Sequence, residues 1–306
     1  MEERLFAISS ESTNMRIDKF LSEQLKDSTR SYLQKLIKDD KAYVNGKIVK
    51  ANYRLSEGEE VRIIIPELIE PNIVAEDIAL DIVYEDDDVL VVNKPKDMVV
   101  HPSAGHYSGT LVNALMFHCK DNLSGINGVL RPGIVHRIDM DTTGLLLICK
   151  NDKAHQFISE QLYNHSITRK YRAVVWNNIS DDVGTIDKPI GRHPNERKKM
   201  STHAKVSKEA ITHYEVLERF GKFCYIECVL ETGRTHQIRV HLASIGHPLL
   251  GDITYGNAKA KTPFNTKGQC LHAMVLGFIH PRTKEYMEFE APLPEYFETI
   301  LQKLRG

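Results

Sequence analysis

The hydrophobic positions near the N-terminus repeat first with the period of a helix and then with that of a strand. Two runs predict helices, each with one apolar face: Ile17, Phe20, Leu21 and Leu25, then Tyr32, Leu33, Leu36 and Ile37. Asn45-Gly46 between two short apolar runs is the strongest short-range hairpin signal, and a last strand over 61–65 stops at Pro66. Two helices and a few strands predict a small domain over residues 15–70.

Beyond this region the pattern predicts a larger domain with many strands, over residues 81–306. Strands are expected at 82–84, 89–92, 145–149, 168–175, 223–231 and 286–291, and a hairpin over 184–214 carries a long charged insertion. Helices are expected at 111–118 and 154–162, after a turn within 232–242, and near the C-terminus from residue 294. This pattern indicates an α+β fold on a mixed, mainly antiparallel sheet with flanking helices. The acidic, proline-containing segment 71–80 is expected to link the two domains.

The segment 135–150 attracts attention because polar groups lead directly into an uninterrupted apolar run. Residues 145–149 read as a strand that is buried on both faces, and Thr142, Thr143 and Gly144 supply the turn before it. Just upstream lie His136, Arg137, Asp139 and Asp141. Charged groups at the mouth of a buried strand are typical of binding and catalytic sites. On this segment alone the two aspartates are better explained as turn formers that hydrogen-bond their own backbone.

Charge and cysteine usage narrow the class of protein. The net charge is −1, yet residues 15–50 carry nine basic against five acidic residues and 188–208 carry seven against one, which predicts separate basic surfaces. The five cysteines include no CxxC pair and predict free thiols in a cytoplasmic protein. No apolar run approaches the ~18 residues of a membrane span, so no membrane association is expected. Glycine-rich nucleotide-binding motifs are missing, and no cofactor is expected.

Three clusters of charged residues, at 136–139, 168–171 and 233–239, interrupt predicted strands and could meet in the folded domain. Arg234 or Arg239 beside Asp139 would keep this carboxylate ionised and oriented. Such an anion suits nucleophilic or general-base work at neutral pH. Tyr171 would add an aromatic face. The basic residues of the strand at 168–175 are expected to alternate outward, toward solvent.

Other chemistry has less support in the sequence. Ser103 lies near His101 and His106 but lacks the G-x-S-x-G turn of many hydrolases. His236 and His241 are five residues apart, which is off one helical face, and no H-E-x-x-H pattern accompanies them. We therefore expect no metal site.

The first domain resembles the S4 (αL-like) RNA-binding domain. The matching segments are Arg-Ile-Asp-Lys-Phe-Leu at 16–21, Ser-Tyr-Leu-Gln-Lys-Leu-Ile at 31–37 and Val-Asn-Gly-Lys at 44–47. Basic side chains lie mainly on or beside the two predicted helices, which is the electrostatic footprint expected for nucleic acid. The resemblance implies a binder of structured RNA, and its candidate RNA-binding residues are Arg16, Lys19, Arg30, Lys35 and Lys38.

The chain as a whole resembles the RluA/RluD family of RNA pseudouridine synthases. The likeness rests on H-R-I-D-M-D-T-T-G-L-L-L at 136–147, T-R-K-Y-R-A at 168–173 and T-G-R-T-H-Q-I-R-V-H at 232–241, in this order after the S4 segment. It implies that Asp139 is the catalytic aspartate and that Arg234 forms an ion pair with it. It also implies that Tyr171 stacks on the target uracil and helps to remove the C5 proton. Arg137 matches the arginine that replaces the extruded base in the RNA stack.

The resemblance assigns supporting roles to the remaining polar residues of these motifs. His136 would act through a neighbouring residue, and Asp141 would serve the turn. His236, Gln237 and Arg239 would support the site or touch phosphate.

The reaction implied by this family converts uridine to pseudouridine. The N1–C1′ bond breaks, the uracil turns over, and C5 is joined to C1′; no cofactor or metal is needed, because the leaving base is also the incoming one. Whether Asp139 attacks C1′ or assists elimination stays open. The expected partner is RNA, foremost 23S ribosomal RNA of the large subunit, and the expected state is a monomer. A synthase acting on tRNA and a non-catalytic S4 ribosome-assembly protein are the alternatives, and the latter would not need Asp139, Tyr171 and Arg234 together.

Overall fold

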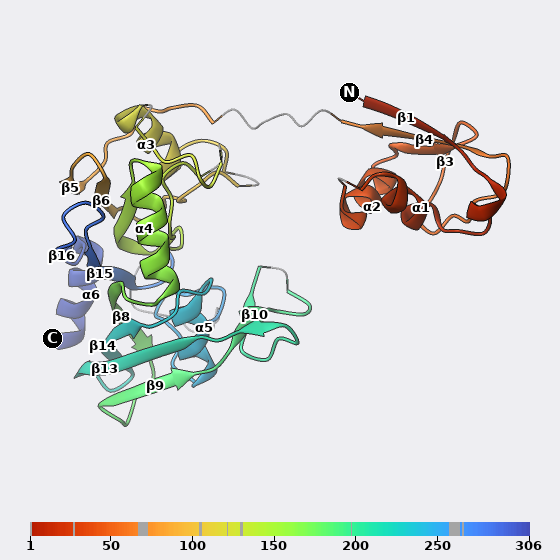
Figure 1. Cartoon of the computed structure of the whole chain (residues 1–306). Helices are drawn as coiled ribbons and strands as arrows, with labels where there is room; N and C mark the ends of the chain where they lie inside the picture. The colour runs from red at the N-terminus through yellow and green to blue at the C-terminus, as the bar shows by residue number, and fades with distance from the viewer. Residues whose placement is uncertain are drawn as a thin grey trace. The chain divides into compact units, whose positions relative to one another are not determined.

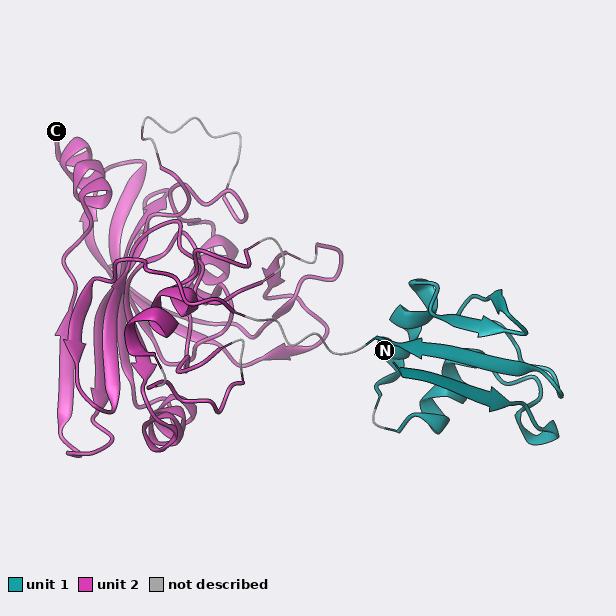
Figure 2. Cartoon of the chain, turned by 90° about the horizontal axis from the view of Figure 1, so that it is seen from above, with its two compact units in different colours: residues 1–70 teal, residues 71–306 magenta. Residues whose placement is uncertain are grey.

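The chain folds into two compact units, each with its own hydrophobic core. The computed structural model describes residues 2–26, 28–66, 73–103, 106–120, 122–128, 131–196, 198–256, 264 and 266–306. The units are Met1–Glu70 and Pro71–Gly306 (Figure 2). Separate clusters of buried apolar side chains fill them, so each unit is described by itself.

The first unit is an antiparallel sheet packed against two helices. Its strands are β1 (Glu2–Ala7), β2 (Ala42–Val44), β3 (Lys47–Ile48) and β4 (Glu60–Ile65), in the order β1-β4-β2-β3. A 3₁₀ turn, η1 (Ser10–Ser12), precedes α1 (Ile17–Gln24) and α2 (Arg30–Lys38). The predicted apolar faces are confirmed, since Ile17, Leu21 and Leu33 are fully buried. Asn45 and Gly46 have φ of 47° and 75°, as a two-residue hairpin of type I′ requires.

Strand β1 extends this unit upstream of the predicted boundary at residue 15. It pairs with β4 along its whole length, from Glu2 opposite Ile65 to Ala7 opposite Glu60. Five of its six residues are exposed and only Phe6 is partly buried, so the strand lacks the alternation that identifies a half-buried strand. The sequence therefore gave no periodic signal for it.

Residues 73–80 pack on the second unit and do not form the predicted linker. Ile73 is buried in the core of that unit. The side chain of Asn113 donates to the Val74 carbonyl at 2.7 Å, and the amide of Glu76 donates to the Asn113 carbonyl at 3.0 Å. Residues 71 and 72 of the predicted linker lie outside the described residues. The prediction is wrong for 73–80 because these residues contribute apolar side chains to a core.

The second unit is built on a nine-stranded sheet. Its main path runs β5-β6-β7-β15-β8-β14-β13-β9, and β16 pairs with β15. Only β7 and β15 pair in parallel; the other pairings described are antiparallel. The predicted mixed, mainly antiparallel sheet of an α+β fold is confirmed. The strands are β5 (Ile82–Glu85), β6 (Val89–Lys94), β7 (Thr143–Cys149), β8 (Thr168–Trp176), β9 (Val183–Asp187), β13 (Ile211–Arg219), β14 (Phe223–Leu230), β15 (Leu271–Ile279) and β16 (Tyr286–Glu290).

Helices cover both faces of this sheet (Figure 1). One face packs against α3 (Leu111–Cys119) and α5 (Gln237–Ser244), and the other packs against α4 (Asp152–Tyr163) and α6 (Glu295–Arg305). Strand β7 shows the division, because Leu146 belongs to the first core and Leu145 and Leu147 to the second. The prediction that residues 145–149 are buried on both faces is confirmed.

A small sheet forms the charged insertion expected between β9 and β13. Its strands are β10 (Ile190–Arg192), β11 (Met200–Ser201) and β12 (Ser207–Lys208), in the order β11-β10-β12. Ile190 and Ala210 pack against Val240 of α5, which fixes the insertion beside that helix. In the part of the chain that is described, no helix is long and apolar enough to cross a membrane. All five cysteines are buried and free.

Candidate active site

A pocket of about 330 Å³ lies where the three charged clusters of the sequence meet. Its walls come from the loop before β7, from β8 and from the turn that leads into α5. Asp139, Tyr171, Arg234 and Arg239 all line it. The sequence-predicted catalytic residues are thus brought together, although they are up to about a hundred positions apart in the chain.

The loop that carries Asp139 is fixed at both ends. At its end, Lys94 Nζ donates to the Met140 carbonyl at 2.9 Å, and also to the Pro95 and Met98 carbonyls. Lys94 is 1% exposed, and burial lowers its pKa to about 7. Three acceptors match the three N–H groups of an ammonium, so the charged form fits the site best. Lys94 therefore ties the aspartate loop to the end of β6.

His136 fixes the start of the same loop. Its Nε2 accepts a hydrogen bond from the amide of Leu147 at 2.9 Å. Burial, together with the charge of the nearby Arg169, lowers the pKa of His136 to about 3. The imidazole is therefore neutral at physiological pH and acts as an acceptor that braces the loop on β7.

Asp139 is held by Arg239, and the expectation that Arg234 forms this ion pair is wrong. Arg239 Nη1 lies 2.7 Å from Asp139 Oδ2. The guanidinium of Arg234 turns away and its Nε donates to the Glu209 carbonyl at 2.8 Å. His236 Nε2 lies 3.6 Å from the other oxygen of Asp139. The Asp139 side chain is 17% exposed, so it faces the pocket and keeps contact with solvent.

A second carboxylate, that of Asp252, orients Arg239 from the opposite side. Arg239 donates through Nε and Nη2 to the two oxygens of Asp252, at 2.7 and 3.0 Å, which is the bidentate geometry of a strong pair. The Asp252 side chain is completely buried. Burial alone would raise its pKa, but hydrogen bonds from Arg239 and from the amides of Tyr255 and Thr254 lower it. Asp252 therefore stays ionised and fixes the arginine.

The turn before α5 places these groups. His236 has φ of 56° and ends the turn, and α5 follows at once. The buried Gln237 holds the turn closed: its Oε1 accepts from Thr232 Oγ1 and from the Arg234 amide, and its Nε2 donates to the Ile211 carbonyl. Arg239 lies two residues into the helix, on the side that meets Asp139 and Asp252.

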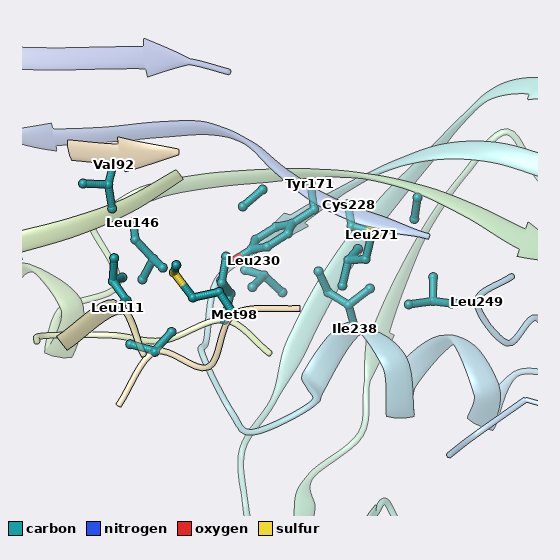
Figure 3. Packing of buried hydrophobic residues seen from close by; sticks show 14 of the residues in the cluster. Val92, Met98, Leu111, Leu146, Tyr171, Cys228, Leu230, Ile238, Leu249 and Leu271 are labelled. Atoms are coloured by element: carbon teal, nitrogen blue, oxygen red, sulfur yellow. The ribbon is translucent and has the colours of Figure 1, made fainter. Parts of the chain in front are cut away.

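Tyr171 lies on the central strand of the sheet. On β8 it faces Cys228 of β14 on one side and Ala273 of β15 on the other. Figure 3 shows the ring among the apolar side chains of this face, with Leu230 nearby. Burial raises its pKa, so the hydroxyl is protonated at neutral pH. Its strand neighbours hold the ring in one place.

Among the described residues, two groups of side chains could hold a metal, and both lie outside the pocket and are already bonded to other partners. Glu85 of the first group, which also contains His118 and Cys119, accepts hydrogen bonds from Lys150 and His118, and burial raises the pKa of the Cys119 thiol to about 11. In the second group, Asp86, Asp88 and His280, Asp88 is bonded to Arg282. Backbone amides donate to His280 Nδ1, which leaves the proton on Nε2 and no lone pair there for a metal.

Comparisons with known proteins agree with the site. The family model for RNA pseudouridylate synthases matches residues 88–244, and that for the S4 domain matches residues 15–61. An uncharacterized RNA pseudouridine synthase of Bacillus subtilis is 57% identical over 97% of this chain and 96% of its own. The chain belongs to the RNA pseudouridylate synthase family. The enzyme therefore isomerises uridine in RNA.

Other relatives of this RNA pseudouridine synthase extend the comparison. The ribosomal large subunit pseudouridine synthase D of Pasteurella multocida is 43% identical over 95% of this chain and 91% of its own. Among solved structures, human RNA pseudouridylate synthase domain containing 1 matches with a TM-score of 0.58 and 26% identity, covering 76% of this chain and 97% of the human chain. The α+β fold and the N-terminal S4 domain of the synthase are confirmed.

Candidate RNA-binding side chains of the synthase are exposed in both units. Arg137 lines the mouth of the pocket and is exposed. In the S4 domain, Arg16, Lys19, Arg30, Lys35 and Lys38 are all exposed. Arg16 and Arg30 both donate to the buried carboxylate of Asp18, at 3.0 and 2.9 Å. Asp18 therefore orients two of the five basic side chains on one surface.

Sequence reasoning missed three residues that build the synthase site: Lys94, Asp252 and Tyr255. Tyr255 joins the others, because its hydroxyl lies 2.8 Å from His236 Nδ1 and its ring lies 5.1 Å from the Arg239 guanidinium. Lys94 and Asp252 stand in segments with family-like flanks, Asn-Lys-Pro at 93–95 and Gly-His-Pro-Leu-Leu-Gly-Asp at 246–252. This signal marked the segments but carried no information about their partners.

Proposed function

We propose that this synthase converts uridines of large-subunit ribosomal RNA to pseudouridine, with Asp139 as the reacting carboxylate. The observation that carries the proposal is the Asp139 carboxylate in the pocket, paired with Arg239 at 2.7 Å and still reachable from solvent. An oriented anion at such a position can attack C1′ or assist elimination. Large-subunit RNA is supported by the name of the relative from Pasteurella multocida.

Tyr171 is proposed to stack on the uracil while the base is detached. The ring stands in the pocket wall and its hydroxyl is protonated at neutral pH, because burial raises the pKa. A flat aromatic surface beside apolar walls would hold a free base while it turns over. With a raised pKa, the hydroxyl accepts the C5 proton only through its neutral oxygen or passes it to another acceptor.

RNA is proposed to contact the enzyme through Arg137 at the pocket and through basic side chains of the S4 domain. Arg137 at the mouth would fill the gap that the flipped uridine leaves in the RNA stack, which offsets part of the few kcal/mol that base flipping costs. The S4 domain would bind structured RNA through Arg16, Lys19, Arg30, Lys35 and Lys38. Five buried free thiols support a reducing, cytoplasmic location, and we propose that the enzyme acts as a monomer.

The test is substitution of Asp139 by asparagine or alanine. Both variants are expected to form no pseudouridine in large-subunit RNA, measured by release of tritium from uridine labelled at C5. RNA affinity should persist, because phosphate contacts dominate binding. Pseudouridine formation by either variant would refute the role of Asp139. Primer extension on carbodiimide-treated ribosomal RNA from a deletion strain would identify the target uridines, and unchanged large-subunit RNA would refute the substrate.

A further inference from the structure

Arg169 is a buried cation in the wall of the pocket, and neither the family match nor the site described above gives it a task. The alternation along β8 places it on the same side as Tyr171, two residues away. The sequence suggests that basic residues of this strand point outward, yet Arg169 is only 6% exposed. It lines the pocket together with Tyr171, Leu230 and Leu271.

The guanidinium of Arg169 has only part of its bonding capacity satisfied. Nη2 donates to the Glu231 carbonyl at 3.0 Å, whereas the buried Nε has no hydrogen-bond partner. Among the residues that are described, no carboxylate lies within ion-pair distance of this side chain. Asp139, the nearby acid of the pocket, is taken by Arg239.

Gly233 makes room for this arrangement. A Cβ atom at position 233 would lie 2.5 Å from Arg169 Nη1, so any other residue would have to displace the guanidinium. A buried charge without a counter-ion costs several kcal/mol, and buried charges in proteins are normally paired. Because an arginine stays protonated in proteins, an unpaired one in a pocket wall is suited to an anionic or strongly polar ligand.

We propose that Arg169 contacts the target uracil and stabilises the negative charge that the base carries when the N1–C1′ bond is broken. The electron pair of this bond leaves with the uracil and spreads over N1, O2 and O4. Asp139 then either adds to C1′ or removes the C2′ proton. When the uracil uses this electron pair to form the C5–C1′ bond, the Asp139–C1′ bond breaks or the C2′ proton returns from Asp139. The C5 proton is then lost and N1 gains a proton. The product is an isomer of the substrate.

The position favours the base over a phosphate as the ligand. Arg169 shares a strand face with the ring proposed to stack on the uracil, whereas the exposed Arg137 stands at the mouth, where the RNA backbone would pass. A donor directed at developing charge inside a water-poor site is worth far more than one in solvent. The proposal rests on the proposed site around Asp139.

The experiment compares full-length Arg169→Met and Arg169→Ala with the wild type in single-turnover reactions at saturating enzyme, using ribosomal RNA labelled at C5. Loss of one such donor is expected to lower the rate constant about 10²–10³-fold. The RNA dissociation constant should stay unchanged. Guanidinium ion at millimolar concentration should restore part of the rate of Arg169→Ala. Arg172→Met is the matched control on the same strand, since Arg172 points to the other face and pairs with Glu227, and its rate should equal that of the wild type.

Three outcomes would overturn the proposal. A weaker RNA affinity with an unchanged rate at saturation would assign Arg169 to a phosphate. A lower melting temperature, with a slow rate that guanidinium does not restore, would reduce it to a support of the turn at Glu231. An unchanged rate for Arg169→Met would exclude any catalytic role. Asp139→Asn is measured in parallel. If Asp139→Asn stays active, the proposed function of the site around Asp139 fails. If Asp139→Asn is inactive and Arg169→Met is as active as the wild type, only the inference about Arg169 fails.

Discussion

The arrangement Asp139–Arg239–Asp252 predicts a specific effect for Asp252→Asn. In the wild type, Asp252 Oδ1 accepts from Arg239 Nη2 and from the amides of Thr254 and Tyr255, and Oδ2 accepts from Arg239 Nε. The amide oxygen of an asparagine would take the place of Oδ1, which accepts from three donors. Its NH₂ group would then face Arg239 Nε, which is itself a donor. One charge-assisted bond is lost and two donors face each other in a fully buried place.

The size of this effect follows from the burial of the pair. A hydrogen bond to a charged group contributes about 1.5–3 kcal/mol, and breaking a buried ion pair costs about 3–5 kcal/mol. Arg239 keeps Asp139 as a partner, so we expect the free energy of unfolding to fall by about 3 kcal/mol. For a domain of this size the melting temperature should fall by about 6–12 °C. Released from one side, Arg239 shifts and takes Asp139 with it, and a displacement of 1 Å costs about 10²-fold in rate.

Calorimetry and tritium release from C5-labelled ribosomal RNA measure the two effects on the same protein. Asp182→Asn is the matched control, because Asp182 pairs with Arg219 at 2.6 Å but is 79% exposed. This pair should contribute about 0–1 kcal/mol to stability and nothing to the rate. The reasoning is refuted if Asp252→Asn melts earlier but isomerises at the wild-type rate, since the arginine would then not orient the reacting carboxylate.

The remaining predictions concern other parts of the molecule. Lys94→Met should leave three carbonyls unsatisfied and lower the free energy of unfolding by about 3 kcal/mol or more, measured by calorimetry. It should also slow isomerisation, measured by tritium release, because the Met140 end of the aspartate loop is no longer held. The pKa of Asp18 is lowered because hydrogen bonds from Gln34, Arg16 and Arg30 outweigh the effect of its burial. The stabilisation from this carboxylate should be complete above the unfolded pKa of about 3.9 and should be lost as pH falls through the lowered folded pKa. The unfolding free energies of the wild type and of Asp18→Asn, measured by acid titration, should therefore converge at low pH. Deletion of 1–70 should weaken RNA binding and flatten its salt dependence while the second unit still melts cooperatively; equal affinity and slope would contradict the role of the S4 domain.

Much of the fold could be predicted because local patterns and tertiary packing agree. The two helices of the S4 domain show one apolar face each, and the Asn45-Gly46 turn fixes the hairpin between β2 and β3. The uninterrupted apolar run at 145–149 predicts burial on both faces, which α3 and α5 on one side and α4 on the other provide. These signals lie in the predicted elements themselves or in the turns beside them.

The features that differ from the sequence predictions share another cause, because each depends on contacts with residues far away in the chain. Strand β1 is held by hydrogen bonds to β4 and buries little of its own surface. Residues 73–80 look like a linker by charge, yet Ile73 finds a core to enter. Arg169 has the residue type of an outward position, and Gly233, far along the chain, leaves the space that its buried guanidinium occupies.

The ion-pair partner of Asp139 is a feature that the sequence motif alone does not determine. Arg234 and Arg239 lie in one short motif, and both are of the right type to pair with a carboxylate. The choice depends on where the turn stops and α5 begins: His236, with φ of 56°, ends the turn, and the helix then directs Arg239 to the carboxylates while Arg234 stays bonded to the Glu209 carbonyl. Asp252 completes the choice, because a buried carboxylate needs a cation that can reach it from inside the fold. The helix start and the buried acid together select the arginine, and neither can be read from the motif alone.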